Sequence, residues 1–277
     1  MPERDSAVSP DVAVLIPVFN DDGRLAATLD SVASQGVPVV IVIVDDGSAT
    51  PVAVGELPGQ CEVVVLRHDT NRGIEHALNT GLAYIQERDL AYVARLDNGD
   101  RCAPGRLARQ RDFLQQHPDV YLVGSAVEWR DDAGRSRFTR VFPAAHETIV
   151  RALHHTTALI HPAVMFRTSV VQTAGMYSAN YPAAEDLEFF WRIARRHRVA
   201  NLPDTLVVTR FDPNGVSVRR RHTQLLSTLR IQLAFFRVGA WTSYAGILKT
   251  LGRLVVPYSW IVAAKRLASR RRPVAAA

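Results

Sequence analysis

Four apolar runs in the first hundred residues each end in a cluster of polar residues, and this pattern limits the fold more than any other feature. The runs are Asp11–Phe19, Val37–Val44, Glu62–Leu66 and Leu90–Leu96. Apolar residues recur at helical spacing in Arg24–Ser34 and Ile74–Gln86, which lie between these runs. Because buried strands alternate with helices, we predict an α/β fold with a mostly parallel central sheet and flanking helices.

The polar clusters occupy the carboxyl ends of the predicted strands, at 20–23, 45–48, 68–73 and 97–100. Ligands of open α/β sheets bind beyond that edge, so we expect the functional site there. The glycine-rich loops GxGxxG and GxxxxGK[ST] are absent from the sequence. The site is therefore not predicted to be that of a dinucleotide-dependent or P-loop enzyme.

The carboxylates of two of these clusters are candidates for ligand contacts. Asp45-Asp46-Gly47-Ser48 either forms a capped turn or hydrogen-bonds a base or ribose. In Asp97-Asn98-Gly99-Asp100, the carboxylates either cap a helix or converge on Mg²⁺ or Mn²⁺ beside a diphosphate. Residue types alone leave both alternatives open.

Three further positions are candidates on chemical grounds. Arg72 opens a predicted helix, where a guanidinium and backbone N–H groups suit phosphate. Glu185 and Asp186 begin a helix predicted over Glu185–Arg196; they either complement the helix dipole or include a general base. His161 stands alone without a triad or metal pattern, and such a histidine is more often structural.

The remaining elements are less regular. A helix is predicted over Pro104–His117, and the turn at Asp131–Gly134 predicts a hairpin. The other predicted strands are Tyr121–Trp129, Arg137–Phe142, Ile160–Phe166 and Leu206–Arg210.

Charge is divided unevenly along the 277 residues, whose net charge is +6. Residues 218–277 contain twelve Lys or Arg and no Asp or Glu, so residues 1–217 carry 6 − 12 = −6. We therefore predict an acidic body, 1–217, and a basic helical tail, 218–277. The two cysteines, Cys61 and Cys102, are too few for a disulfide framework, which favours a reducing compartment.

Six motifs occur in a characteristic order: IPVFNDDGRLAATLDSV, VDDGS, NRGIEHALNTGL, ARLDNGD followed by PGRLARQ, HPAVMFR and AEDLEFFWRI. In this order they resemble those of the bacterial family 2 glycosyltransferases, and the similarity covers roughly Val12–Ser217. The resemblance implies the nucleotide-sugar-binding fold called GT-A and an inverting sugar transfer to a hydroxyl of a glycan or lipid-linked acceptor. A role in cell-surface polysaccharide synthesis is expected.

The resemblance assigns roles to individual residues. Nucleotide contacts are implied for Pro17, Phe19, Asn20, Asp45, Asp46, Arg72 and Asp97. Asp186 matches the catalytic base, which deprotonates the acceptor hydroxyl. Glu185 and His161 are expected to border the acceptor.

Two departures from the family pattern concern the metal, expected to be Mg²⁺ or Mn²⁺. The third position of the DxD motif is Gly99, and Asp212 stands where the family often has a histidine. We hypothesise that Asp97, Asp100 and Asp212 supply the metal ligands, with Asp212 partly compensating for Gly99. The alternative is weak or dispensable metal binding.

The basic tail carries interleaved aromatic residues, a composition that suits an anionic membrane surface. Packing on the catalytic domain or in a homodimer is the alternative. No secretory signal or bilayer-length apolar run is visible, so we expect a cytoplasmic protein at the inner face of the cell membrane.

Two other functions are alternatives that make different demands on the sequence. A sugar-nucleotide pyrophosphorylase should have a glycine-rich basic signature near Pro17–Gly23, which is absent. A nucleic-acid-binding protein, suggested by the pI of about 9.7, should have basic crevice loops, whereas these loops are acidic. No nucleic-acid partner is therefore expected.

Overall fold

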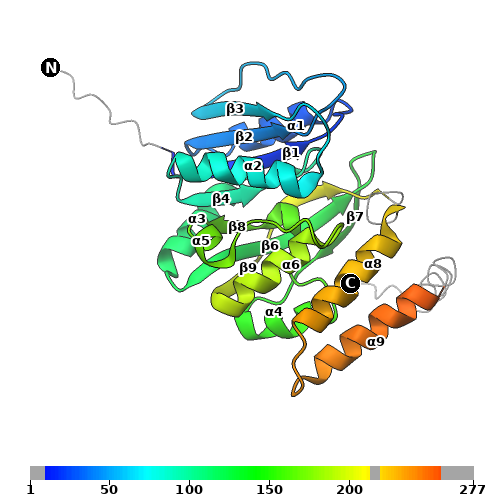
Figure 1. The fold of residues 1–277 in the computed structure, drawn as a ribbon. Coiled ribbons are helices and arrows are strands. Elements are labelled where there is room, and N and C mark those ends of the chain that lie inside the picture. Colours follow the sequence, from blue (N-terminus) through cyan, green and yellow to red (C-terminus); the bar gives the residue numbers. More distant parts are fainter. Residues whose placement is uncertain (1–9, 213–218, 257–277) are drawn as a thin grey trace, which may run out of the picture.

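The computed structural model describes residues 10–212 and 219–256 and contains one mixed sheet with helices on both faces (Figure 1). The strands are β1 (Val12–Val18), β2 (Val39–Asp45), β3 (Cys61–Arg67), β4 (Tyr92–Arg95), β5 (Arg101–Cys102), β6 (Val120–Arg130), β7 (Ser136–Arg140), β8 (Met165–Arg167) and β9 (Arg198–Arg210). The helices are α1 (Leu25–Ala33), α2 (Ile74–Glu87), α3 (Arg106–Gln116), α4 (His146–Leu153), α5 (Val170–Ala174), α6 (Glu185–Arg196), α8 (Arg221–Ala234) and α9 (Trp241–Val255).

The strand order is β3-β2-β1-β4-β8-β6-β9-β5, with β7 paired to β6. The half formed by β3, β2, β1 and β4 is parallel throughout, whereas β8 joins both β4 and β6 in antiparallel fashion. The long β6–β9 pairing is again parallel. The α/β class with flanking helices is confirmed, and the parallel half brings the strand ends that carry the polar clusters to one edge.

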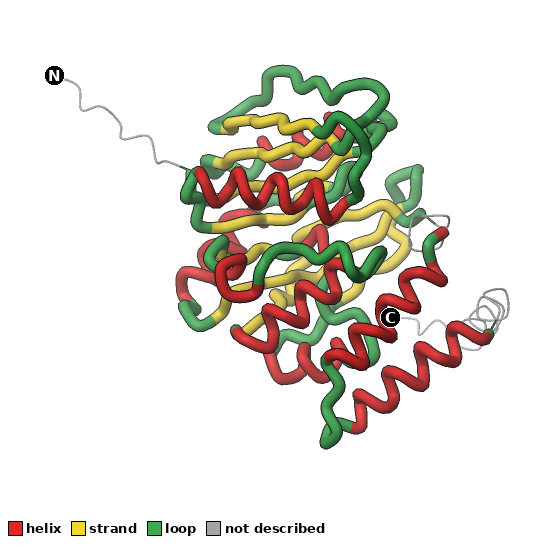
Figure 2. The backbone as a smooth tube through the Cα atoms, in the orientation of Figure 1, coloured by secondary structure: helices red, strands yellow, loops and turns green. Residues whose placement is uncertain are grey.

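Alternate residues of the central strands build two separate cores. In β1, Val12, Val14 and Ile16 pack on the side of α1 and α3, while Ala13 and Leu15 pack on the side of α2 and α6. Because side chains of a strand point alternately to its two faces, a run that is apolar at every position requires helices on both faces. Figure 2 shows helices on both sides of the sheet.

Two predicted strands differ from those observed. The prediction of a strand over Ile160–Phe166 is wrong in its first half, because His161–Ala163 forms a 3₁₀ turn and only Met165–Arg167 is a strand. Pro162 lacks the N–H that a ladder needs, and this absence costs nothing in the first turn of a helix. The predicted Leu206–Arg210 is the end of the much longer β9, whose pairing with β6 shifts register.

The tail helices α8 and α9 pack against the lower half of the molecule (Figure 2). Phe235 stacks on Trp191 of α6 with ring centroids 5.1 Å apart, and Gln232 Nε2 donates to the carbonyl of His154 at 2.9 Å. The rest of the predicted tail, 257–277, lies outside the described residues. Among the residues that are described, no helix has both the length and the apolar character needed to cross a membrane.

Candidate active site

The loops that follow β1 and β2 are joined by hydrogen bonds at the carboxyl edge of the sheet. The N–H of Asn20 donates to Ser48 Oγ at 2.8 Å, and the N–H of Ala49 donates to Asn20 Oδ1 at 3.0 Å. Pro17 lies within β1, and the side chain of Phe19 is exposed beside these loops. The structure thus brings together the predicted nucleotide residues from two strand ends.

Asp45, at the end of β2, is fully buried and bonded entirely within the protein. Its carboxylate accepts from the N–H groups of Ser48 at 2.9 Å and Val52 at 3.1 Å, and it forms an ion pair with Arg67. Burial alone would raise the pKa of Asp45, but these hydrogen bonds and the Arg67 charge outweigh it and leave the pKa below its ordinary value. Asp45 is therefore an anchor for its loop.

Asp46 performs the same task for the next loop. It accepts from the N–H groups of Arg72 and Gly73, both at 2.9 Å, and lies 2.7 Å from Nδ1 of His68. Asp46 thus occupies the N–H of Gly73, the N-cap of α2, and the N–H of the residue before it. The side chain of Arg72 is exposed and stays open to a ligand.

The glycine at position 47 is required by this arrangement. Gly47 has φ +72°, and a Cβ there would collide with the backbone of Thr70. The loops after β2 and β3 therefore pack backbone against backbone, which fixes where Asp46 points.

A buried arginine lies under the other half of the site. Arg95 of β4 is fully buried; it donates to the carbonyls of Leu15, at 3.3 Å, and Leu96, and pairs with Asp97. Sequence reasoning missed this residue, although an arginine inside an apolar strand was a visible signal. A buried guanidinium is stable only when anions and carbonyl oxygens surround it, and the acidic side chains near Arg95 meet this requirement.

Four carboxyl groups lie close to Arg95. Burial and the charge of Asp97 raise the pKa of Asp100 to about 7. Burial, and then the charge of Asp186, raise the pKa of Glu185 to about 7, and Glu185 Oε2 has no hydrogen-bond partner among the described residues. Asp100 and Glu185 can therefore hold protons near neutral pH, in contrast to Asp45.

Asp186 occupies the first turn of α6. Burial raises the pKa of Asp186; the hydrogen bond from the N–H of Leu187, at 2.7 Å, opposes the shift, and the nearby charge of Asp97 adds to it. Asp186 also lines a cavity of about 280 Å³, whereas Glu185 does not. A carboxylate with a raised pKa beside a cavity is suited to accept a proton from a bound hydroxyl.

His161 was expected to border the acceptor, but the structure places it in the core. Its side chain is only 8% exposed, and Nε2 lies 2.9 Å from the hydroxyl of Tyr177. Burial, and then the charge of Arg95, hold the pKa of His161 well below its ordinary value. We correct the prediction accordingly: His161 is a neutral packing residue that positions Tyr177.

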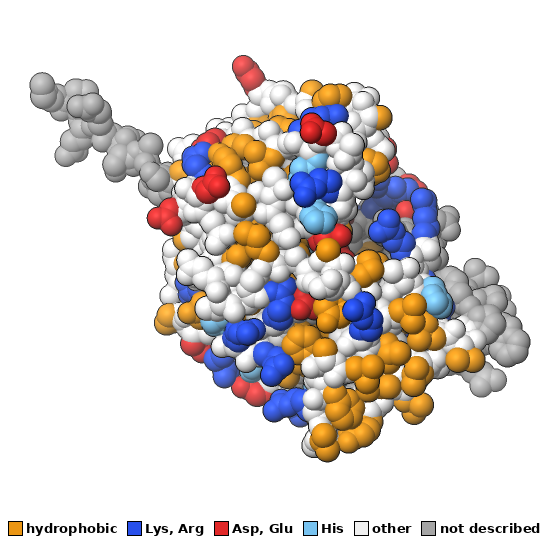
Figure 3. Space-filling view, viewed as in Figure 1, with side chains coloured by type: hydrophobic (Ala, Val, Ile, Leu, Met, Phe, Trp, Pro, Cys, Tyr) orange, Lys and Arg blue, Asp and Glu red, His pale blue; other side chains and the backbone are white. Residues whose placement is uncertain are grey.

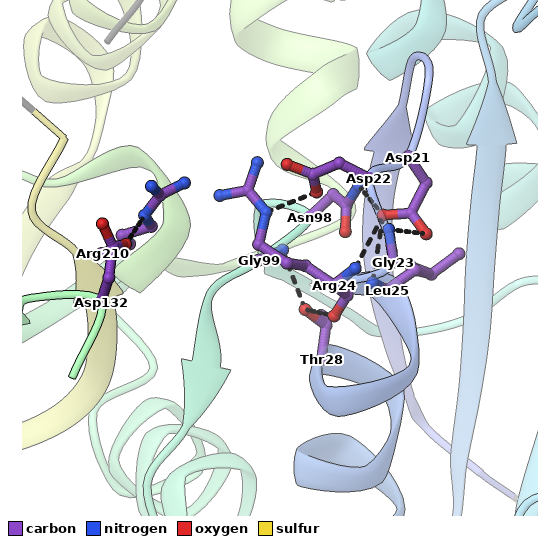
Figure 4. A network of polar contacts seen from close by, with 10 residues as sticks. All are labelled: Asp21, Asp22, Gly23, Arg24, Leu25, Thr28, Asn98, Gly99, Asp132 and Arg210. Atoms are coloured by element: carbon purple, nitrogen blue, oxygen red, sulfur yellow. Dashed lines mark hydrogen bonds and ion pairs between the residues drawn. The ribbon is translucent and has the colours of Figure 1, made fainter. Parts of the chain in front are cut away.

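The side chains around Gly99 do not fit a metal held by carboxylates of this loop. Asp100 is only 6% exposed, so it does not replace the carboxylate missing at Gly99. Gly99 has φ +94°, and a Cβ there would lie 3.3 Å from Nη1 of Arg24, whose Nε pairs with Asp22 at 2.5 Å (Figure 4). A guanidinium thus stands where the family's second metal ligand would project.

Asp212 follows Arg210 at the end of β9, and Arg210 pairs with Asp132 at 2.5 Å (Figure 4). Within 10–212 and 219–256, no group of three or more acidic, histidine or cysteine side chains is placed to hold a metal. Asp97, Asp100 and Asp212 therefore do not form one ligand set in this structure.

The sheet, the strand-end carboxylates and the acid on α6 define a glycosyltransferase of the GT-A class. Residues 13–175 match the family model described as glycosyl transferase family 2. The chain therefore belongs to glycosyl transferase family 2, as its motifs predicted.

A curated relative and two solved structures extend this comparison. The amylovoran biosynthesis glycosyltransferase AmsE of Erwinia amylovora is 30% identical over 237 residues, covering 82% of this chain and 87% of the relative. S. aureus TarS 1–349 in complex with UDP-GlcNAc has a TM-score of 0.63 at 17% identity, covering 86% of this chain and 72% of that one. The mannosyltransferase PcManGT of Pyrobaculum calidifontis, solved with GDP-Man and Mn²⁺, has a TM-score of 0.59 at 18% identity. The match covers 96% of this chain and 77% of that one. At these identities, the two structures support the fold alone.

Proposed function

We propose that this glycosyltransferase binds a nucleotide sugar at the loops after β1 and β2 and transfers the sugar, with inversion, to an acceptor hydroxyl beside Asp186. The observation that carries the proposal is the group of proton-holding carboxyls around Arg95. It lies at the carboxyl edge of the parallel strands, where α/β sheets bind their ligands.

The chemistry follows from the properties of these groups. Asp186 takes the proton of the acceptor hydroxyl as the oxygen attacks the anomeric carbon, and the bond from that carbon to the diphosphate breaks. The raised pKa of Asp186 makes it a stronger base than an ordinary carboxylate. Asp97, whose side chain is 41% exposed, is positioned by Arg95 to meet the ribose side of the donor.

For the donor, we propose contacts from the exposed Phe19, from Asn20 and from the side chain of Arg72. Asp45 and Asp46 hold the loops that shape the nucleotide site. Both carboxylates are buried and bonded within the protein, so we propose that they act on the donor through the loops they hold.

The role of a divalent ion is proposed to be minor. PcManGT was solved with Mn²⁺, but here Gly99 offers no ligand, Asp100 is buried and Asp97 is paired with Arg95. We propose that the diphosphate binds without a tightly held ion, close to the cations Arg24 and Arg210.

The acceptor is proposed to be a glycan or lipid-linked glycan used in cell-surface polysaccharide synthesis. The relative AmsE, which is named for amylovoran biosynthesis, supports this proposal. A position on the inner surface of the membrane suits such an acceptor. The support is α9, which exposes Trp241, Tyr244, Leu248, Leu251 and Val255.

These five residues, the α9 stripe, recur at intervals of three and four residues and so share one face of the helix. Trp241 is 75% and Val255 83% exposed, and Figure 3 shows apolar side chains gathered at the place of α9. Because residues 218–277 contain no acid, an anionic lipid surface complements this face better than a second copy of the same basic helix.

Flotation on liposomes with and without anionic lipid tests the membrane position. The full chain should float with anionic vesicles, and Leu248→Glu should reduce flotation at least fivefold, since a charge on the stripe opposes insertion. Val65→Glu, on the distant edge strand β3, is the control. Equal flotation of both variants, or a dimer that Leu248→Glu dissociates, would contradict the proposal.

The transfer function itself is tested with a panel of UDP-, GDP- and dTDP-sugars. Thermal shift reports donor binding, and slow hydrolysis of the sugar–phosphate bond reports activation. We expect one nucleotide class to stabilise the protein and to be hydrolysed. Binding to DNA with a steep salt dependence, and to no nucleotide sugar, would instead favour a nucleic-acid-binding protein.

A further inference from the structure

The cavity that Asp186 lines is enclosed by elements from distant parts of the sequence. Its walls come from the 153–159 segment, from α6, and from α8 and α9 of the tail. Three cationic side chains contribute to it: Arg140 of β7, and Lys249 and Arg253 of α9. The cavity therefore connects the proposed base with the basic tail, and the tail completes it.

The charge of this lining is unbalanced. Among the described residues that line the cavity, Asp186 is the only acid, against three Lys or Arg side chains. Arg140 and Arg253 form no ion pair with any residue that the structure describes. A concave surface lined mainly by one sign of charge concentrates ligands of the opposite sign.

Two of the three cations, Arg140 and Lys249, are held in place by a single loop. Arg140 Nη2 donates to the carbonyl of Thr157 at 3.3 Å, and Lys249 Nζ donates to the carbonyl of His155 at 2.8 Å. The same helix, α9, is fixed against this loop at Gly246, where a Cβ would collide with the carbonyl of His154. These contacts fix α9 and its side chains against the loop, so the grouping of cations is a feature of the fold.

We propose that this cavity is the acceptor subsite and that it binds a phosphate or diphosphate group through Arg140, Lys249 and Arg253. Guanidinium and ammonium groups are the usual protein ligands of phosphate oxygens. The anionic group lies close enough for a hydroxyl of the same acceptor to reach Asp186. The α9 stripe continues on the helix that supplies two of the cations, so an apolar chain attached to the phosphate has a surface to follow.

This inference rests on the proposed function, since it names the acceptor class of the same reaction. A diphosphate probe could also occupy the donor site, so the test is made with UDP, or whichever nucleoside diphosphate the donor panel selects, held at saturation. Two probes are titrated calorimetrically into the full chain: inorganic pyrophosphate and farnesyl diphosphate.

We expect both probes to bind alongside the nucleotide, and the pair Arg140→Gln and Arg253→Gln to weaken them at least tenfold while nucleotide affinity is unchanged. Arg109→Gln, an exposed arginine paired with Asp204 elsewhere, is the matched control. Tighter binding of farnesyl diphosphate than of pyrophosphate would assign the anion to a lipid; equal affinity would assign it to a hydrophilic phosphorylated glycan.

The inference is overturned if the saturating nucleotide excludes the probes, or if the double variant binds them as wild type does. Failure of every nucleotide to bind wild type would instead overturn the proposed function. A double variant that misfolds would lose nucleotide binding too. In that case the single changes Arg140→Lys and Arg253→Lys replace it. They keep the positive charge but not the paired N–H donors of the guanidinium, so each should weaken probe binding severalfold.

Discussion

The carboxylates after β2 and those around Arg95 occupy the same edge of one sheet, yet their environments are opposite. Asp45 and Asp46 accept hydrogen bonds from backbone N–H groups and contact Arg67 and His68. The acids around Arg95 lie close to one another and are largely buried, and the pKa values of Glu185 and Asp100 rise to about 7. The first pair holds loops in place, and the second group can exchange protons.

This difference shows how one fold separates binding from chemistry. A carboxylate whose oxygens are bonded by the protein stays charged and rigid, so it can shape a nucleotide site without reacting. A carboxylate in a crowd of acids carries a free-energy cost in its charged form, and accepting a proton relieves that cost. The predictions below test each side of the comparison.

The largest stability effect is expected at Arg95. Arg95→Met removes the buried cation that all four acids share and leaves only Arg106, which acts on Asp100. Loss of one partner from a buried ionic group costs about 3–5 kcal/mol. Urea denaturation at pH 7 measures this loss in the free energy of unfolding. The control Arg109→Met removes an exposed arginine and should cost less than about 1 kcal/mol. Equal losses of unfolding free energy in the two variants would mean that Arg95 does not stabilise the surrounding carboxylates.

A smaller loss is expected at Asp46. Asp46→Asn exchanges a carboxylate that accepts two backbone N–H groups for an amide, which should lower the free energy of unfolding by about 2 kcal/mol. It should also weaken nucleotide binding, because the loops after β2 and β3 lose their common anchor. Asp69→Asn alters an exposed carboxylate of the same loop and serves as the control. Unchanged stability in Asp46→Asn would show that the anchor is dispensable.

The raised pKa of Glu185 predicts a pH dependence with a definite sign. A folded-state pKa of about 7 exceeds the unfolded value of about 4.3, so the stability that Glu185 contributes is present below pH 4 and lost as pH rises through 7. Between pH 5 and 8, the free energy of unfolding of wild type should therefore fall relative to that of Glu185→Gln, by on the order of 1–2 kcal/mol. Parallel curves for the two proteins would contradict the raised pKa.

The smallest effect is expected from metal. Nucleotide affinity in EDTA and in Mn²⁺ should differ by less than about threefold. The loop Asp97–Asp100 offers a single exposed carboxylate, whereas divalent ions need several oxygen ligands. Asp212→Ala should behave as wild type in the same titration. Binding that requires Mn²⁺ in wild type and is lost in Asp212→Ala would restore the hypothesis that Asp212 compensates for Gly99.

Much of the fold was predictable because its signal is local. The four apolar runs and the helices between them are found within a few residues of their predicted bounds. The runs that became β1, β2 and β4 are buried on both faces, and such a strand must be apolar at nearly every position. The elements that were missed, β5, α4 and α5, are short and depend on tertiary contacts. The early part of β9 was hidden because Pro203 and Asp204 interrupt its apolar pattern.

The candidate site was predictable in residue type but not in environment. Motif order singled out Asp46, Asp97 and Asp186, yet nothing local indicates that Asp46 is fully bonded or that Asp100 is buried. Those properties depend on residues of other elements: the N–H groups of Arg72 and Gly73 donate to Asp46, and Thr209 of β9 hydrogen-bonds Asp100. His161 was misjudged for the same reason, because burial is decided by the helix that covers it.

The most direct test of the account measures donor binding and sugar transfer together in wild type and Asp186→Asn, a change that keeps the shape of the side chain. We predict that nucleotide affinity stays within about threefold while turnover falls by about 10²–10⁴, the usual contribution of a general base. Transfer that survives in Asp186→Asn, or a donor affinity that is lost with it, would contradict the division between a binding group and a reacting group of carboxylates.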